Sequence, residues 1–171
     1  MPRTYEPIAS QTLGSSASTI SFSSIPATYT DLRLILSHLH TSTVVQSAGI
    51  QFNSDTGSNY STTYLDGNGS AAISGRLTSE TSLVISYRPS ASAPNDIPVV
   101  AIVDIQSYAN TNVNKTALTA QSSHFSSGGF VSRYVGLWRS TSAINAITIM
   151  NRGGGSFLSG TTAALYAIKA A

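Results

Sequence analysis

The amino-acid sequence predicts an all-β protein: an antiparallel β-sandwich, jelly-roll-like, with about 8–10 short strands. Three observations predict this fold class. Apolar and polar side chains alternate over short stretches along the whole chain, turn-forming residues separate these stretches, and no stretch has the periodicity of an amphipathic helix. Because the 171 residues contain no linker and no internal repeat, we expect a single domain over residues 1–171.

Charged residues are scarce, and hydroxyl side chains take their place. Asp, Glu, Lys and Arg make up 9% of the chain, against about 25% of an average soluble domain. The chain contains 30 Ser and 19 Thr residues. A monomer in solution relies on charged side chains to keep strand edges and apolar patches apart. The composition therefore favours a protein whose surface is partly covered in an assembly over a solitary β domain that hydroxyl groups keep soluble.

The clearest strand of the N-terminal half is expected at residues 31–39. Leu32, Leu34 and Leu36 alternate with more polar positions there, which places the three leucines on one face. Residues 53–59 are rich in Asn, Asp, Ser and Gly, and we expect them to form the loop of a β-hairpin. Other strands are expected at residues 8–13, 19–22, 49–52 and 60–65.

The C-terminal half contains the longest apolar run, residues 97–108. It is expected to form a central strand covered on both faces, or two strands around a bulge. The Gly-rich residues 152–155 follow a strand, and no helix begins after them to bind a phosphate, so we interpret them as a hairpin loop. The remaining strands are expected at residues 82–87, 116–121, 130–138, 143–150 and 162–170.

Residues that could bind a metal are few. The chain has three histidines, His38, His40 and His124, and no cysteine. His38 and His40 leave a strand on the same side, so together with His124 they could form a metal site at a threefold axis. We favour the alternative, two strand-end residues and one loop residue with nothing in common. No metal and no cofactor are expected.

The carboxylates do not indicate catalysis either. They lie singly along the chain, most of them beside turns, whereas a glycosidase needs two that face each other across a substrate. Asp104 is the exception, because it lies in an apolar run. We expect it to be hydrogen-bonded inside the sheet or to face a subunit interface. Residues 53–59 loosely resemble a calcium loop but lack the later Glu, so we interpret them as a turn. With no nucleophile elbow and no phosphate loop, no catalytic residue is assigned and the protein is not expected to be an enzyme.

Aromatic side chains offer two interpretations. Tyr60, Tyr64, Tyr134 and Trp138 could stack on sugar rings, but aromatic residues on alternating strands more often pack in a core or against another subunit, and we favour the latter. The residues expected to contact another subunit or a partner are Tyr5, Ile8, Tyr134, Trp138 and Arg139. The basic residues are scattered, so no nucleic acid is expected as a partner, and no apolar stretch is long enough to predict a membrane span.

Six stretches together resemble a known family. They are residues 5–9 (YEPIA), 12–14 (TLG), 25–32 (IPATYTDL), 52–60 (FNSDTGSNY), 135–140 (VGLWRS) and 165–171 (LYAIKAA). As a set, and over nearly the whole chain, they look like small virion structural proteins of tailed bacteriophages. The family has glycine where Ala167 stands here. The resemblance implies a jelly-roll-like sandwich on the particle exterior, often trimeric, and supplies no catalytic residues.

Two functions compete under this resemblance. In the first, the chain is a capsid decoration (cement) protein: a homotrimer made in the host cytoplasm that binds the major capsid protein on the outer surface of the virion. Residues 1–13 would then be an N-terminal arm or an edge strand in subunit contacts. In the second, it is a tail-fibre or adhesin module among the tail proteins and binds a host surface glycan through loops such as 57–60 or 153–156. The absence of a coiled-coil or shaft-like region favours decoration.

Overall fold

The computed structural model describes residues 5–39, 46–88, 97–125 and 128–169, which form twelve strands and no helix. The strands make two antiparallel sheets, one of eight strands and one of four, packed face to face. The predicted fold class, an all-β antiparallel sandwich, is therefore confirmed. The number of strands exceeds the 8–10 that the sequence predicted.

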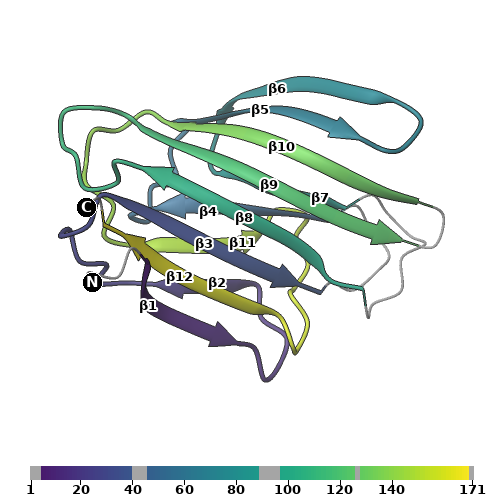
Figure 1. Cartoon of the computed structure of the whole chain (residues 1–171), viewed down its shortest axis with the longest axis horizontal. Coiled ribbons are helices and arrows are strands. Elements are labelled where there is room, and N and C mark those ends of the chain that lie inside the picture. The colour runs from purple at the N-terminus through teal and green to yellow at the C-terminus, as the bar shows by residue number, and fades with distance from the viewer. Residues whose placement is uncertain (1–4, 40–45, 89–96, 126–127, 170–171) are drawn as a thin grey trace.

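The larger sheet faces the viewer in Figure 1, and all of its neighbouring strands are antiparallel. We call the face that it turns toward the smaller sheet its inner face, and the opposite one its outer face. In spatial order its strands are β1 (Tyr5–Thr12), β12 (Thr162–Ile168), β3 (Asp31–His38), β8 (Val99–Gln106), β9 (Lys115–Phe125), β10 (Gly128–Trp138), β5 (Tyr60–Gly67) and β6 (Ala72–Glu80).

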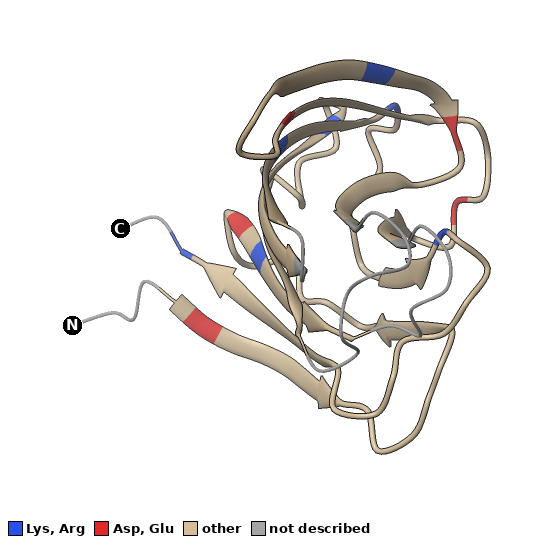
Figure 2. Ribbon diagram, turned by 90° about the vertical axis from the view of Figure 1, so that its right-hand side faces the viewer, with Lys and Arg blue, Asp and Glu red and all other residues tan. Residues whose placement is uncertain are grey.

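The smaller sheet lies behind the larger one in Figure 1. Its strands, in spatial order, are β2 (Thr19–Phe22), β11 (Ile147–Asn151), β4 (Gln46–Phe52) and β7 (Leu83–Arg88). Figure 2 shows the sandwich from the side, with the β5–β6 end of the larger sheet curling over the smaller one. The curl follows from the twist that accumulates across a wide sheet.

Strand β3 shows how the sequence builds the core. Leu32, Leu34 and Leu36 are fully buried on the inner face, whereas Ile35 on the outer face is only half-buried. The predicted alternation is thus confirmed, as it is for β2, where Ile20 contributes to the same core. The apolar faces of both sheets meet in one cluster, and each large aliphatic side chain buried there contributes roughly 1.5–3 kcal/mol.

Residues 97–108 contain a single strand, β8 (Val99–Gln106), with only its inner face covered. The strand is central, between β3 and β9, but Ile102 points outward and is 36% exposed. The expectation of a strand covered on both faces is therefore wrong. The sequence also gave no sign of β6, because this strand is largely exposed and its polar and apolar residues do not alternate clearly.

Two loops that were expected to close β-hairpins connect strands of different sheets. Residues 53–59 lead from β4 in the smaller sheet to β5 in the larger one, so the expected hairpin between these strands is wrong. Residues 152–155 likewise run from β11 toward β12, which belong to different sheets. In both places the sequence specifies a change of direction, with Asn53 and Ser54 at positive φ, but the next strand pairs elsewhere.

The inner face of the larger sheet divides into two halves of different chemistry. We call β12, β3 and β8 the aliphatic half, and β9, β10 and β5 the polar half. One row of paired residues runs from β12 to β5 as Leu165, Leu34, Val103, Thr119, Tyr134 and Tyr64. The next row runs as Ala163, Leu36, Ala101, Gln121, Ser132 and Asp66. The change from aliphatic to polar falls between β8 and β9 in both rows.

Candidate functional site

The outer face of the larger sheet carries a group of exposed aliphatic side chains. They come from four adjacent strands, β8, β9, β10 and β5, and are between 36% and 71% exposed. Leu118 and Val135 are directly paired across β9 and β10. We call this group the outer patch; it consists of Leu65, Ile102, Leu118, Val131 and Val135.

An apolar group of this kind is unusual for a sheet face turned toward solvent. Antiparallel sheets with one solvated face normally place polar residues there. Four strands span about 14 Å at the usual spacing between neighbours, and the one charge within the patch is the exposed Arg133, between Val131 and Val135. Groups of exposed apolar side chains on one face mark sites where another protein binds. The outer patch is therefore the candidate functional site.

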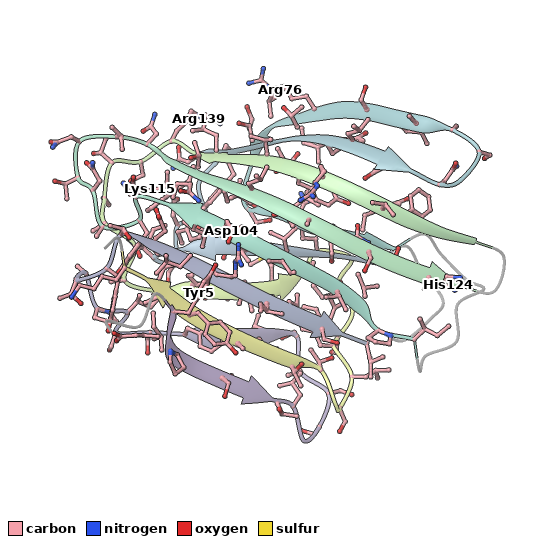
Figure 3. All side chains as sticks on the ribbon, viewed as in Figure 1. Tyr5, Arg76, Asp104, Lys115, His124 and Arg139 are labelled. Carbon is pink, nitrogen blue, oxygen red and sulfur yellow. The ribbon has the colours of Figure 1, made fainter. Side chains whose placement is uncertain are left out.

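The same face carries a neutralised ion pair beside the patch. Arg33 on β3 donates from Nε and Nη2 to the two carboxylate oxygens of Asp104 on β8, at 2.6 and 2.8 Å. The Tyr5 ring lies 5.4 Å from the Arg33 guanidinium carbon, and Figure 3 shows Tyr5 and Asp104 on this face. Of the two expectations for Asp104, hydrogen bonding within the sheet is thus confirmed. The pair adds no net charge to the face.

The five residues predicted to contact a partner fall into two groups. Tyr5 is 45% exposed, Arg139 is exposed, and Ile8 is partly buried against the core, so these three have surface to offer and their role in a contact stays a prediction. Tyr134 and Trp138 are each only 2% exposed. These two point inward from β10 and pack within the sandwich, so they have almost no accessible surface in this chain, and their role in a contact stays a prediction.

Trp138 anchors the loop between β4 and β5. Its indole Nε1 donates to Asp55 Oδ2 at 2.7 Å, and its ring stacks on Tyr60 with centroids 6.2 Å apart. The hydrogen bond from Trp138, with further bonds from Asn59 and Gly57, holds the pKa of Asp55 below its ordinary value. Burial raises the pKa of Tyr60 to about 12. Because Tyr60 and Trp138 are both buried, they cannot form an exposed platform for sugar rings.

Arg139 holds the same loop from the other side. Its guanidinium donates to the carbonyl oxygens of Ser58 and Tyr60 and to the Ser61 hydroxyl, at 3.1–3.3 Å. Its backbone N–H donates to Asn59 O at 2.8 Å. Residues 53–59, interpreted from the sequence as a turn, are thus a hydrogen-bonded turn. The Asp55 carboxylate accepts hydrogen bonds from the Gly57 backbone N–H and from Asn59 Nδ2, and a calcium ion would have to compete with these donors for the same oxygens.

The structure does not bring the histidines together. His38 is buried with Nε2 2.7 Å from the Ser86 hydroxyl, whereas His124 is exposed near the end of β9. Figure 3 shows His124 at the edge of the molecule. His40 lies outside the described residues. Within the described ranges, no three His, Asp or Glu side chains converge as metal ligands.

Residues 5–12 form an edge strand, which is one of the two roles expected for the N-terminal segment. β1 pairs with β12 on one side and has no neighbour on its other side among the described strands. Most of its residues are exposed. Residues 1–4 lie outside the described part of the chain.

The outer patch was missed at the level of sequence, although a signal for it exists. Residues 130–138 have large side chains on both faces, since Val131 and Val135 alternate with Tyr134 and Trp138. Such a strand is expected to be covered twice, once by the core and once by something else. Because both faces are apolar, the sequence alone does not tell which one the chain itself covers.

Comparisons with known proteins identify no relative: no family model, no curated protein and no solved structure matches the chain. Among the described residues, no helix is long and apolar enough to cross a membrane. Function is therefore argued from the geometry of the chain itself.

Proposed function

We propose that the protein is a non-enzymatic structural subunit of a bacteriophage virion, a capsid decoration (cement) protein that binds neighbouring subunits through its outer patch. The observation that carries the proposal is the group of exposed aliphatic side chains on four adjacent strands of the outer face, around the exposed Arg133. Burying such a surface stabilises an assembly by roughly 25 cal/mol per Å² removed from water, less the entropy lost on association.

The strand order supports the jelly-roll part of the proposal. Eight strands pair as β1–β12–β3–β8 in one sheet and β2–β11–β4–β7 in the other. Taken in sequence order, successive members of this set alternate between the two sheets except at β4 and β7, which are paired neighbours in the smaller sheet, as expected of a jelly roll. The other four strands are two hairpins, β5–β6 and β9–β10, which widen one edge of the larger sheet. These hairpins supply most of the outer patch, so the widening and the binding surface belong together.

The tail-fibre alternative has less support. Three of its four candidate aromatic residues, Tyr60, Tyr134 and Trp138, are buried in the sandwich. Hydrogen bonds to Asp55 and Arg139 fix the loop at residues 57–60. A glycan at this loop would therefore contact polar backbone, and none of the three buried rings would be accessible to it.

Copy number in purified virions is the decisive measurement. Quantitative mass spectrometry of the phage particles should give a ratio to the major capsid protein near that of a shell component. A ratio lower by an order of magnitude or more would move the chain to the tail and contradict the decoration proposal.

The outer patch is tested with charge substitutions at Leu118 and Val135, which are directly paired. Leu118→Glu and Val135→Glu place a carboxylate on an exposed aliphatic position, so folding is retained while a dry contact is lost. We expect at least tenfold weaker binding to particles that lack the chain, and loss of the predicted homotrimer in sedimentation equilibrium. Val113→Glu is the matched control, because Val113 is also exposed but lies outside the patch. Wild-type binding by the patch variants would refute the assignment of this face.

A further inference from the structure

A cavity opens beside the polar half of the inner face, away from the outer patch. Its volume is about 390 Å³, at the lower end of the range for small-molecule sites. It lies between β5, β6 and β10 of the larger sheet and β4 and β7 of the smaller one. Four aromatic side chains contribute to its walls: Tyr64, Tyr87, Phe130 and Tyr134.

The aromatic walls meet at a right angle. The rings of Tyr87 and Phe130 come from different sheets, with centroids 6.1 Å apart and planes at 85°. Tyr64 and Tyr134 are paired across β5 and β10. The Tyr134 hydroxyl donates to Gln121 Oε1 at 3.0 Å, and burial, with a smaller effect of the nearby Asp66 carboxylate, raises the pKa of Tyr134. The Tyr134 ring is therefore neutral and held in place, and the faces of the four rings attract cations.

One carboxylate in this cavity has unused hydrogen-bonding capacity. Asp66 on β5 lines the cavity and is 7% exposed, yet its Oδ1 atom accepts no hydrogen bond. Arg152 also lines the cavity, but its charge is matched by an ion pair with Glu80. Among the described lining residues, Asp66 is thus the charge without a counter-charge. A buried carboxylate in that position costs free energy that an opposite charge would offset.

We propose that this cavity binds an organic ammonium group, with the cation between the perpendicular aromatic rings and beside Asp66 Oδ1. The site combines the two features that recognise alkylated ammonium groups: ring faces and one uncompensated negative charge. An anion would be repelled by Asp66, and a neutral sugar would leave the carboxylate without an opposite charge. The inference is independent of the outer patch, since the two surfaces are on opposite faces of the larger sheet.

The test compares choline with its uncharged carbon isostere, 3,3-dimethylbutan-1-ol, on the full chain. Amide chemical shifts in NMR titrations should show saturable choline binding localised to β5, β7 and β10. We expect choline to bind at least tenfold more tightly than the isostere, and its affinity to fall as salt concentration rises. Equal affinity for both compounds, or no saturable shift with choline, would overturn the proposal.

Two variants assign the binding to the named groups. Asp66→Asn keeps the side-chain shape and removes the charge, so we expect at least a tenfold loss of choline affinity with little change for the isostere. Phe130→Leu removes one ring wall and should weaken choline binding several-fold. Glu6→Gln is the control, since Glu6 lies on β1 at the opposite edge of the sheet and should leave binding unchanged. Undiminished choline binding by a folded Asp66→Asn protein, or glucose binding that exceeds choline binding, would refute the assignment. Because the outer-patch variants keep this cavity, failure here leaves the test of the proposed function intact.

Discussion

The aliphatic and polar halves of the inner face share one hydrogen-bonded sheet, yet they stabilise the protein differently. In the two rows described above, the inward side chains on β3 and β8 are Leu, Val and Ala, fully buried against the smaller sheet. On β9, β10 and β5 the same rows continue with Thr, Gln, Ser and Asp, and with two tyrosines. Several of these polar groups, such as Gln121 Nε2 and Ser123 Oγ, have no partner in the described structure. Regular strand pairing therefore does not require an apolar face, provided that a neighbouring half supplies the core.

This difference assigns the stability of the fold to the aliphatic half and the candidate binding surfaces to the polar half. Burying aliphatic surface contributes to folding without direction, whereas a buried polar group contributes only when its partner is present. The polar half extends a fold that the aliphatic half already stabilises. The polar half contributes little stability itself, and it can therefore form the cavity on its inner face and the outer patch on its outer face.

The largest expected effect comes from opening the aliphatic half. Leu34 is fully buried at the centre of its row, so Leu34→Ala should lower the free energy of unfolding by about 3 kcal/mol through lost burial and a residual cavity. Thr119→Ala, in the same row of the polar half, should cost about 1 kcal/mol or less. Urea denaturation of both variants measures the contrast, and equal losses would remove the distinction between the halves.

Lys115 tests whether a buried charge in the polar half can be fully satisfied. Its ammonium is buried at the start of β9 and donates to the carbonyl oxygens of Asn110, Val113 and Thr141 at 2.5, 2.8 and 3.1 Å. Lys115→Met should lower the free energy of unfolding by about 2 kcal/mol, because three carbonyl groups lose a charged donor. Hydrogen exchange should accelerate in residues 109–114. A change below about 0.5 kcal/mol in chemical denaturation would show that water replaces the ammonium at no cost.

Asp55 gives a smaller effect that depends on pH. Its pKa in the folded protein is lowered, chiefly by the Trp138 indole, so its contribution to stability is present above the ordinary pKa of 3.8 and is lost as pH falls through the lower folded value. Asp55→Asn should cost about 1 kcal/mol at pH 7. The difference from wild type should shrink below about pH 4. Thermal unfolding from pH 7 to pH 2 measures this difference, and a constant offset across the range would contradict the role of the ionised carboxylate.

The sequence predicted individual strands better than their partners. Leu32, Leu34 and Leu36 follow a period of two, and β3 was predicted within one residue for that reason. The loop at residues 53–59 was also recognised, but its Asn and Gly residues specify only a reversal of direction. Whether β5 pairs with β4 or leaves for the other sheet depends on contacts with β10, which lies about 70 residues later.

The candidate sites were less predictable, because each combines distant segments. Alternation correctly placed Tyr134 and Trp138 on one face of a strand, but not which face the chain covers. Asp66 is followed by Gly67, Asn68 and Gly69, which in sequence indicate only a turn, and the curl of β5 and β6 over the smaller sheet brings it to Tyr87 and Phe130. A cavity between two sheets has no local sequence signal of its own.

The smallest expected effect on stability is at Ser123, where the aliphatic and polar halves can be compared most directly. This serine is buried on β9, and its hydroxyl has no hydrogen-bond partner in the described structure. Ser123→Ala should therefore change the free energy of unfolding by less than about 0.5 kcal/mol, or raise it, because the variant removes a desolvated polar atom and leaves the backbone pairing with Phe130 intact. Ala163→Ser is the reciprocal change: it puts a hydroxyl beside Leu36 in the aliphatic half and should cost about 1–3 kcal/mol. Chemical denaturation of the two variants measures both values. If the two substitutions change the free energy of unfolding in opposite directions, the polar half tolerates polar groups because of its surroundings and not because of strand pairing. A similar loss of stability in both variants would show that Ser123 is hydrogen-bonded in solution.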